Sequence, residues 1–310
     1  MQKLAALSVD LDEVDNYLSI HGLRADLLEP RARNAIYDRA IPRLAQLFAE
    51  LDVPATFFAI GRDLRRKENQ TRLRALATQG HEIANHSLNH LYDLSRRPRS
   101  EQAREVAGGS DAIEQAVGAR PVGFRAPGYT ITDQLFEVLR DQGVQYDSSV
   151  FPCPPYYLAK VAAISAIRLR GRQSHSVVDH PRVLTAPADP YRVGAPYTQR
   201  GRGLTELPIG VTRDASGRLP YIGTALALAG VAGTRALTQL IASRPFVNLE
   251  LHGIDLCGAQ DDGLLPLLPY QADLRRSLAD KRAALVEAVN GLKRAGFVFA
   301  TLSEAARLVV

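Results

Sequence analysis

Residues 55–90 read ATFFAIGRDLRRKENQTRLRALATQGHEIANHSLNH, and this stretch decides the fold. Its first six residues predict a strand, residues 62–79 have a helical pattern, and the residues after Gly80 predict a second strand. Gly80 stands where a glycine commonly ends a helix, because glycine adopts the left-handed backbone conformation without steric cost. A strand, a helix and a second strand in this order predict a parallel βαβ unit.

The same alternation continues through most of the chain. Strands are predicted over Leu4–Val9, Ala55–Ile60, His81–Ala84, Val122–Arg125, Val144–Tyr146, Leu204–Val211, Phe246–Leu251 and Phe297–Thr301. Helices are predicted near Ala35–Leu51, Arg62–Gln79, Ser100–Val117, Thr132–Gln142 and Asp273–Ala295. This order predicts an α/β fold in which mainly parallel strands form a closed or nearly closed barrel with the helices outside.

One segment breaks the alternation. Residues 152–203 are rich in proline and arginine, and we expect them to be an insertion that covers the barrel of a single domain spanning residues 1–310. Within the insertion, residues 156–172 (YYLAKVAAISAIRLRGR) mix apolar and basic side chains and could lie on an anionic lipid surface. The alternative is that this segment and the apolar stretch Leu219–Ile241 pack on the barrel or form a contact between subunits of a homo-oligomer.

The amino-acid composition excludes several classes of protein. The 310 residues are 46% hydrophobic and 23% charged, which excludes a disordered or fibrous chain. The net charge is +5 and the pI about 9.3, which permits an anionic partner, but no nucleic-acid-binding motif accompanies the charge. Two cysteines cannot form a disulfide framework. We expect a cytoplasmic protein without a signal peptide or a transmembrane helix, with peripheral contact at the inner membrane surface as an option.

Candidate catalytic residues gather at the ends of the predicted strands, where a parallel barrel collects its reactive groups. The first strand ends in Asp10-Leu11-Asp12, and the third leads into His86 and His90. The i, i+4 spacing of the two histidines would place both imidazoles on one face of a helical turn. Two histidines and one carboxylate are a common hydrolytic metal site, and zinc is its usual occupant. Of the two aspartates, one can bind the metal while the other stays free as a base.

Five motifs resemble those of the polysaccharide deacetylase (NodB-homology, carbohydrate esterase family 4-like) family. In chain order they are SVDLDEVD, GHEIANHSLNH, GFRAPGYT, YDSSVF and LELHGID, over about residues 5–255. The resemblance implies the distorted (β/α) barrel of that family. The first motif departs from the commonest form, because the aspartates are split as Asp10-x-Asp12 instead of being adjacent. The split is similar to that of peptidoglycan-deacetylase-like members, and related variants occur among allantoin and cyclic-imide hydrolases.

The resemblance assigns a role to each matching residue of the metal and base sites. Asp12, His86 and His90 would hold one divalent ion, most often zinc, with cobalt, nickel or manganese as alternatives. Asp10 would be the general base that takes a proton from water. Arg125 would pair with Asp10 and keep it ionised, since a nearby cation favours the charged form of a carboxyl group.

The remaining roles concern the leaving group and the oxyanion. His252 would be the general acid that protonates the departing amine, and Asp147 would orient and charge it. The backbone N–H of Gly128 would donate to the oxyanion. Asp255 could tune His252 or simply form a turn. His175 and His180 could be drawn into a second metal pair, although a polar, proline-flanked segment favours exposed loop residues.

The function that follows is hydrolysis of an amide. The leading hypothesis is a metal-dependent hydrolase that removes the N-acetyl group from an amino sugar in a glycan or a lipid-linked saccharide. The alternative, prompted by the split Asp10-x-Asp12, is a C–N hydrolase of small cyclic amides or ureides, like allantoinase or cyclic-imide hydrolase. The first reaction releases acetate and the second a ring-opened acid, so the products separate the two.

Overall fold

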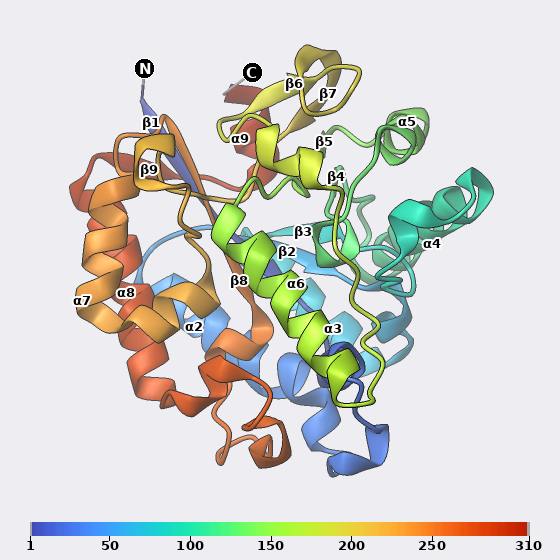
Figure 1. Ribbon diagram of the computed structural model, residues 1–310, viewed down its shortest axis with the longest axis vertical. Helices are drawn as coiled ribbons and strands as arrows, with labels where there is room; N and C mark the ends of the chain where they lie inside the picture. The colour runs from blue at the N-terminus through green and yellow to red at the C-terminus, as the bar shows by residue number, and fades with distance from the viewer. Residues whose placement is uncertain (1, 309–310) are drawn as a thin grey trace.

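The computed structural model describes residues 2–308, and a curled sheet of mostly parallel strands forms its centre (Figure 1). The strands described are β1 (Lys3–Asp10), β2 (Thr56–Ala59), β3 (Glu82–Asn85), β4 (Gly123–Phe124), β5 (Tyr146–Asp147), β6 (Tyr191–Val193), β7 (Arg200–Glu206), β8 (Phe246–His252) and β9 (Phe297–Phe299). Their order is β6-β7-β5-β4-β3-β2-β1-β8, and β9 pairs with the first residues of β1. Only the β6–β7 pairing is antiparallel. The predicted α/β fold, a distorted (β/α) barrel, is confirmed.

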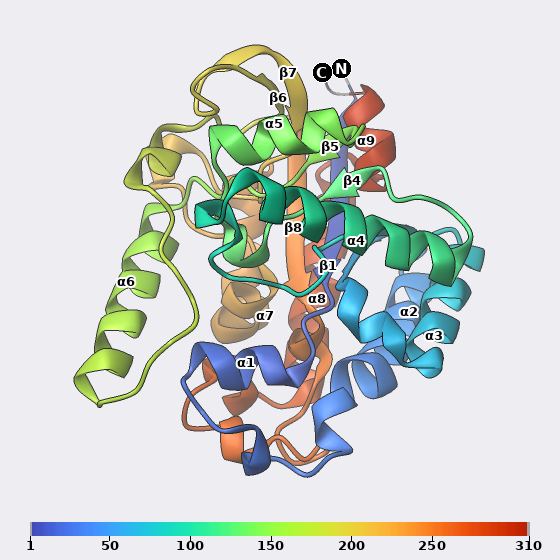
Figure 2. The ribbon, with the colours of Figure 1, turned by 90° about the vertical axis from the view of Figure 1, so that its right-hand side faces the viewer.

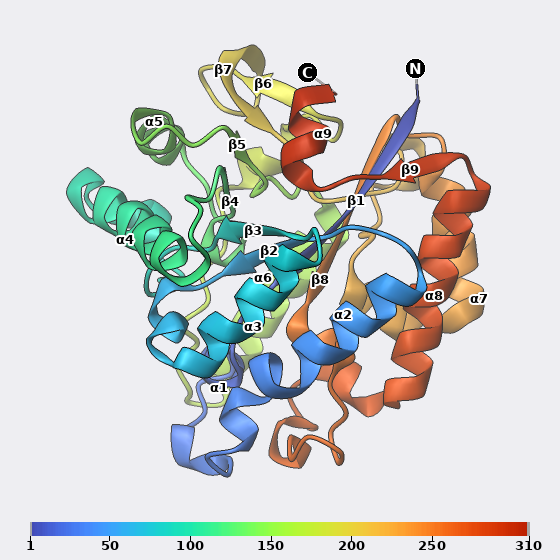
Figure 3. The same cartoon turned by 180° about the vertical axis from the view of Figure 1, so that it is seen from behind.

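Helices cover the outside of this sheet. They are α1 (Val14–Ile20), α2 (Ile41–Glu50), α3 (Lys67–Thr78), α4 (Arg99–Val117), α5 (Asp133–Asp141), α6 (Pro154–Leu169), α7 (Gly223–Ile241), α8 (Leu278–Arg294) and α9 (Leu302–Leu308). Figure 3 shows α3, α2 and α8 on the side of the sheet that faces the viewer. The turn after α3 uses Gly80 at a φ of +88°, which explains the glycine at that position.

Alternating residues of the central strands separate an outer core from the barrel interior. In β1, Ala5, Leu7 and Val9 pack in the large cluster beneath the helices, whereas Leu4 and Ala6 belong to the interior cluster. Because side chains alternate along a strand, Ser8 and Asp10 continue the interior series. In β8, Asn248, Glu250 and His252 likewise alternate with the outward-facing apolar residues of the large cluster. The interior thus changes from apolar to polar towards the carboxyl ends of β1 and β8.

Irregular chain, rather than a continuous ladder, closes the barrel between β7 and β8. The N–H of Gly210 donates to the carbonyl of Asn248 at 2.8 Å, and Ile222 forms an isolated bridge with Glu250. The strand predicted over Leu204–Val211 instead ends at Glu206. Pro208 lies in the remainder and has no N–H to donate to a ladder.

The predicted insertion, residues 152–203, divides into two parts. Its first part is α6 and the segment that follows; α6 crosses in front of the strands in Figure 1 and stands at the edge of the molecule in Figure 2. Its last part belongs to the sheet, because β6 pairs with β7 and β7 pairs in parallel with β5. Expecting the whole segment outside the barrel was therefore wrong for residues 191–203. The exposed, arginine-rich start of β7 has no apolar alternation to signal a strand.

Helix α7 contains the long apolar stretch singled out in the sequence. By length and composition it is the one helix within residues 2–308 that could cross a membrane. It is bent at Gly230 (φ +67°), and it packs against α8 and β8. Its outer side leaves Leu228, Val231 and Leu240 exposed. One side of α7 therefore packs on the barrel, which is one of the two alternatives considered for this stretch.

Candidate active site

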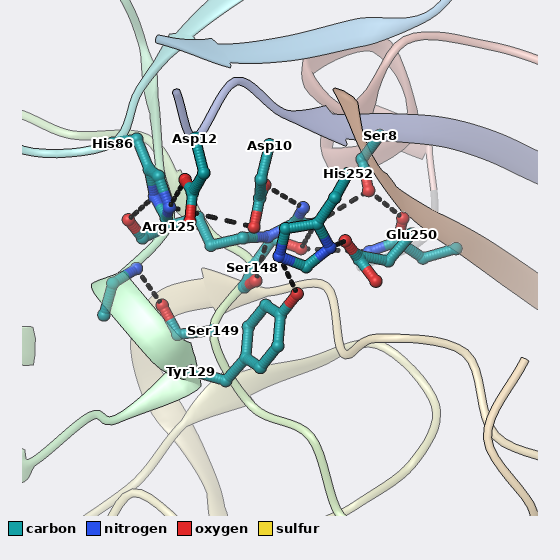
Figure 4. Close-up of polar contacts among 12 residues, drawn as sticks. Ser8, Asp10, Asp12, His86, Arg125, Tyr129, Ser148, Ser149, Glu250 and His252 are labelled. Atoms are coloured by element: carbon teal, nitrogen blue, oxygen red, sulfur yellow. Dashed lines mark hydrogen bonds and ion pairs between the residues drawn. The ribbon is translucent and has the colours of Figure 1, made fainter. Parts of the chain in front are cut away.

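Four strands of the barrel, β4, β3, β1 and β8, deliver the candidate residues to one edge of the sheet (Figure 4). Asp10 ends β1 and lies in register with His252, the last residue of β8. His86 directly follows β3, and Arg125 directly follows β4. The carboxyl ends of parallel strands meet at the same edge, so residues far apart in the chain come together there. Asp147 is the predicted residue whose contacts differ from its assigned role.

Asp12, His86 and His90 form a compact set of metal-ligand atoms. Asp12 Oδ1 lies 3.3 Å from His86 Nε2, and Asp12 Oδ2 lies 3.2 Å from His90 Nε2. All three side chains are buried, and their ligand atoms lie within 4.8 Å of one another. Asp12 Oδ1 and His90 Nε2 have no hydrogen-bond partner. Because unpaired buried polar atoms are costly, this set fits a bound divalent ion.

The surroundings prepare the three side chains for an ion. His86 Nδ1 donates to the carbonyl of Arg125 at 2.7 Å, which leaves Nε2 free to bind a metal. Burial would raise the pKa of Asp12, but His90 and His86 outweigh burial and hold that pKa well below its usual range. Burial lowers the pKa of His90. Asp12 and His90 are therefore favoured in the forms that bind a metal, an ionised carboxylate and a neutral imidazole, whereas Asp10 and Asp12 raise the pKa of His86.

The two histidines converge through a loop, not through a helical turn. Ser87 and His90 both have positive φ, +67° and +55°, so the predicted helical geometry of the pair was wrong. Asn85 Oδ1 accepts the N–H of Ser87 at 2.8 Å, and Ser87 Oγ accepts the N–H of His90 at 3.0 Å. Gly109 of α4 lets Asn85 lie close, because a Cβ there would stand 2.2 Å from Asn85 Oδ1. These side-chain hydrogen bonds replace the helical ones.

Asp10 lies beside this set and is held by Arg125. Arg125 Nη1 donates to Asp10 Oδ1 at 2.7 Å, and Asp10 Oδ2 lies 3.8 Å from His86 Nε2. The guanidinium is fully buried and also donates to Ser8 Oγ and Ser148 Oγ at 2.8 and 2.9 Å. Its face lies 4.2 Å from the centre of the Phe58 ring. The predicted pairing of Arg125 with Asp10 is therefore present, and it keeps one carboxylate outside the metal set.

His252 takes its charge partner from its own strand. His252 Nδ1 lies 2.9 Å from Glu250 Oε1, and Nε2 lies 3.3 Å from the hydroxyl of Tyr129. Burial would lower the pKa of His252, but the Glu250 carboxylate outweighs burial and raises that pKa well above its usual range. The Glu250 carboxylate therefore favours the protonated imidazole, the form that can donate a proton. Its side chain is 23% exposed against 1% for Asp10, which makes His252 the member of the site that solvent reaches.

Glu250 replaces Asp147 in the predicted role of orienting His252. Sequence reasoning missed Glu250, although the spacing Glu250-x-His252 on a predicted strand places both side chains on one face. The Oδ atoms of Asp147 instead accept the N–H and the Oγ–H of Ser149, both at 2.9 Å. Ser149 Oγ in turn accepts the N–H of Ala126 at 2.8 Å. Asp147 therefore fixes the loop that follows Arg125, and its assignment to His252 was wrong.

Asp255 supports His252 through the backbone. Asp255 Oδ2 accepts the N–H of His252 at 2.9 Å. Asp255 therefore contacts His252, as one of its two predicted roles requires, and it does so within the turn that follows β8.

The other two histidines considered for a metal lie elsewhere. His180 Nδ1 accepts the N–H of Arg182, and the metal-like groups among residues 2–308 do not include His175 or His180.

Gly128 lies at the mouth of the site, next to side chains that the sequence did not point to. Its φ is +61°, and its carbonyl accepts a hydrogen bond from Lys160 Nζ of α6 at 2.8 Å. Burial lowers the pKa of Lys160 to about 8. The Tyr129 and Tyr156 rings lie 6.0 Å apart beside this contact. Helix α6 thus contributes a cation and an aromatic side chain to the edge of the site.

The chain is similar to known polysaccharide deacetylases. The polysaccharide deacetylase family model matches residues 34–146. A peptidoglycan deacetylase of Helicobacter pylori is 27% identical over 158 residues, which are 50% of this chain and 53% of that protein. A peptidoglycan-N-acetylglucosamine deacetylase of Bacillus cereus is 33% identical over 104 residues, 34% of this chain and 47% of that protein. The resemblance to the polysaccharide deacetylases is confirmed.

The curated matches cover only part of each relative. The chain spans about half the length of the curated relatives it matches. A solved structure from Mycobacterium smegmatis, assigned to the polysaccharide deacetylases, covers 100% of this chain and 91% of its own at a TM-score of 0.63 and 21% identity, which shows a common fold. The polysaccharide deacetylase match includes His86, His90 and Arg125, but it begins after Asp10 and Asp12 and ends before β8. The assignments of Asp10, Asp12, Glu250 and His252 therefore do not rest on that match.

Proposed function

We propose that this protein is a metal-dependent hydrolase that removes the N-acetyl group from an amino sugar of a glycan or a lipid-linked saccharide. The observation that carries the proposal is the separation of three functions within one small site. One carboxylate and two histidines form the metal set, Asp10 stands beside it on Arg125, and His252 stands at the exposed side on Glu250. A site that only bound a metal would need the metal set but not Asp10 and His252 with their partners.

Each group has a task that follows from its protonation state. A bound divalent ion supplies Lewis acidity, which polarises the amide carbonyl and makes water a stronger acid. Asp10, held by Arg125, accepts the proton of the attacking water. His252, charged by Glu250, donates a proton to the departing nitrogen, without which the tetrahedral intermediate returns to the amide. The backbone around Gly128 is available to the oxyanion at the same edge.

The metal we propose is zinc. Two histidines and one carboxylate with open positions are the usual ligands of hydrolytic zinc. Cobalt, nickel and manganese accept the same ligands, and availability selects among them. The ligand set therefore predicts a single divalent ion per chain and favours zinc among the candidates.

Product analysis tests the proposed reaction directly. The zinc-loaded protein should release acetate from N-acetylglucosamine oligomers, and a chelator should stop the release until zinc is added back. Allantoin and a cyclic imide are the matched substrates for the alternative C–N hydrolase reading, prompted by Asp10-x-Asp12. Ring-opened acid from either, without acetate from the sugars, would replace the proposal by that alternative.

Helix α6 supports a further part of the proposal, peripheral contact with an anionic lipid surface. Leu158 and Leu169 are 66% and 89% exposed, although both lie on an apolar helix, and Arg170 follows directly after it. Exposed leucines flanked by arginine are typical of helices that lie in a lipid interface. Lys160 of the same helix reaches Gly128, so lipid bound at α6 would lie close to the site.

Flotation with vesicles containing phosphatidylglycerol tests this contact at low salt. The protein should float with the vesicles, and serine at both Leu158 and Leu169 should reduce the floating fraction several-fold because apolar burial drives insertion. Leu308→Ser is the matched control, since that leucine is 67% exposed on α9. Failure of the unaltered protein to float would remove membrane contact from the proposal and leave the hydrolysis untouched.

A further inference from the structure

A large cavity adjoins the metal set on the side of His90. Its volume is about 1010 Å³, at the upper end of the range for ligand pockets. His90 and Tyr92 form the wall that it shares with the candidate active site. The other walls come from α1, from the turn Gly61–Arg65 and from the segment after α6. His90 is the member of the metal set that lines this space, so a ligand bound there would lie next to His90.

The segment after α6 closes the cavity by attaching to α1, and Figure 2 shows both at the same end of the molecule. Ser174 Oγ donates to the carbonyl of Ile20 at 2.6 Å, and the N–H of His175 donates to the carbonyl of Ser19 at 3.3 Å. The Arg172 guanidinium lies 4.7 Å from the centre of the Tyr270 ring. The insertion thus builds one wall of the cavity in a fixed position.

Positive charge predominates in the lining. Six arginines face four carboxylates there, and three of the carboxylates are paired with arginines: Asp15 with Arg33 at 2.6 Å, Asp93 with Arg97 at 2.8 Å and Asp63 with Arg62 at 3.5 Å. The carboxylate of Glu13 accepts three backbone N–H groups instead of an arginine. Within residues 2–308, Arg65 and Arg168 have no ion pair. These two guanidinium groups are available to a ligand.

Two residues of the cavity lining, Asn16 and the metal-set residue His90, carry buried polar atoms without partners among residues 2–308. Asn16 Nδ2 and His90 Nδ1 lack a hydrogen-bond partner, and each residue is 3% exposed. Arg62 is held next to them, because it donates to Asn16 Oδ1 at 2.6 Å and to the carbonyl of Asn89 at 2.8 Å. Unsatisfied buried donors are costly unless a ligand or water accepts from them. The same wall therefore offers several donors to one acceptor-rich group.

We infer that this cavity binds an anionic group, a carboxylate or a phosphate, carried by the saccharide whose N-acetyl group is hydrolysed. The planar guanidinium matches either group with paired hydrogen bonds. The inference rests on the proposed function and adds to it the class of substrate: an acidic N-acetylated saccharide. Asp63 Oδ2, also buried and without a partner, can accept a hydroxyl of the same sugar.

The zinc-loaded enzyme tests this inference with three sugars: N-acetylglucosamine, its 1-phosphate, and N-acetylmuramic acid, which bears a carboxylate. We expect at least one acidic sugar to have a kcat/KM about tenfold above that of the neutral sugar. Replacing both Arg65 and Arg168 by glutamine should reduce this preference about tenfold through KM, since charge-assisted hydrogen bonds are lost. The value for the neutral sugar should stay within twofold. Comparison of the phosphate with the carboxylate identifies the bound group.

Arg104→Gln is the control for loss of a positive charge elsewhere, because Arg104 is exposed on α4, away from the cavity; it removes one of the two charges that the double variant removes. Equal kcat/KM for neutral and acidic sugars, or an equal fall for both in the double variant, would overturn the inference. If no sugar is hydrolysed, the proposed function fails instead, and the cavity is judged by calorimetric titration of the zinc-loaded protein with inorganic phosphate. Binding about tenfold weaker in the double variant supports the anionic site, and equal binding contradicts it.

Discussion

Asp10→Asn is expected to lower kcat for N-acetyl hydrolysis by about 10²–10⁴-fold and to leave one metal ion per chain. Asparagine keeps the size of aspartate and can still accept a hydrogen bond from Arg125, but it cannot take a proton from water at neutral pH. The metal should remain, because Asp10 lies outside the set of Asp12, His86 and His90. Steady-state rates and metal analysis of the same preparation measure both effects.

His86→Ala supplies the contrast to this variant. It removes one of the three ligands, so both the metal content and the rate should fall to near zero, and added zinc should restore little of either. The pair separates two ways of losing activity, one with the metal present and one without it. Loss of metal from Asp10→Asn would make Asp10 a ligand, and retention of metal by His86→Ala would show that the ligand set is misassigned.

The local pattern of the chain predicted most of the fold. Strands buried on both faces give apolar runs that are easily found, and helices such as α4 end within a residue of the prediction. The helix predicted from Asp273 begins instead at Leu278, after the cap of Ser277. Asp273 is buried against Lys281 at 2.9 Å, a contact that only the folded chain creates. The helix propensity of the local sequence cannot reveal such a tertiary contact.

The candidate site also contains residues that the local sequence predicts and residues that only tertiary packing determines. Asp12, His86 and His90 could be predicted because their positions follow from strand ends, which are local features. The partner of His252 could not be chosen by chain position alone, since Asp147 and Glu250 both lie at the ends of barrel strands. The contribution of α6 was also hidden, because the path of a helix after an irregular segment depends on tertiary packing. Lys160 reaches Gly128 only through that path.

Glu250→Gln is expected to lower kcat about 10- to 100-fold at neutral pH and to move the alkaline limb of the pH–rate profile to lower pH. In the unaltered protein Glu250 raises the pKa of His252, so the imidazole stays protonated, and active as an acid, until the pH passes that raised value. Glutamine removes the charge, while burial, which lowers the pKa, remains. The limb should therefore fall towards the ordinary histidine range of about 6.5, with Asp10 and Asp12 still favouring the charged imidazole. The profile of kcat against pH measures this shift.

Asp147→Asn distinguishes this account from the pairing that the sequence first suggested. Asp147 fixes Ser149, and through it the N–H of Ala126, so the variant should lose activity by disturbing the loop beside Arg125. The alkaline limb should stay at the same pH as in the unaltered protein, because Glu250 Oε1 remains 2.9 Å from His252 Nδ1. A limb that moves in Asp147→Asn and not in Glu250→Gln would return the orienting role to Asp147. Since both variants exchange one carboxylate for an amide, the position of the limb assigns the partner independently of how much rate either variant loses.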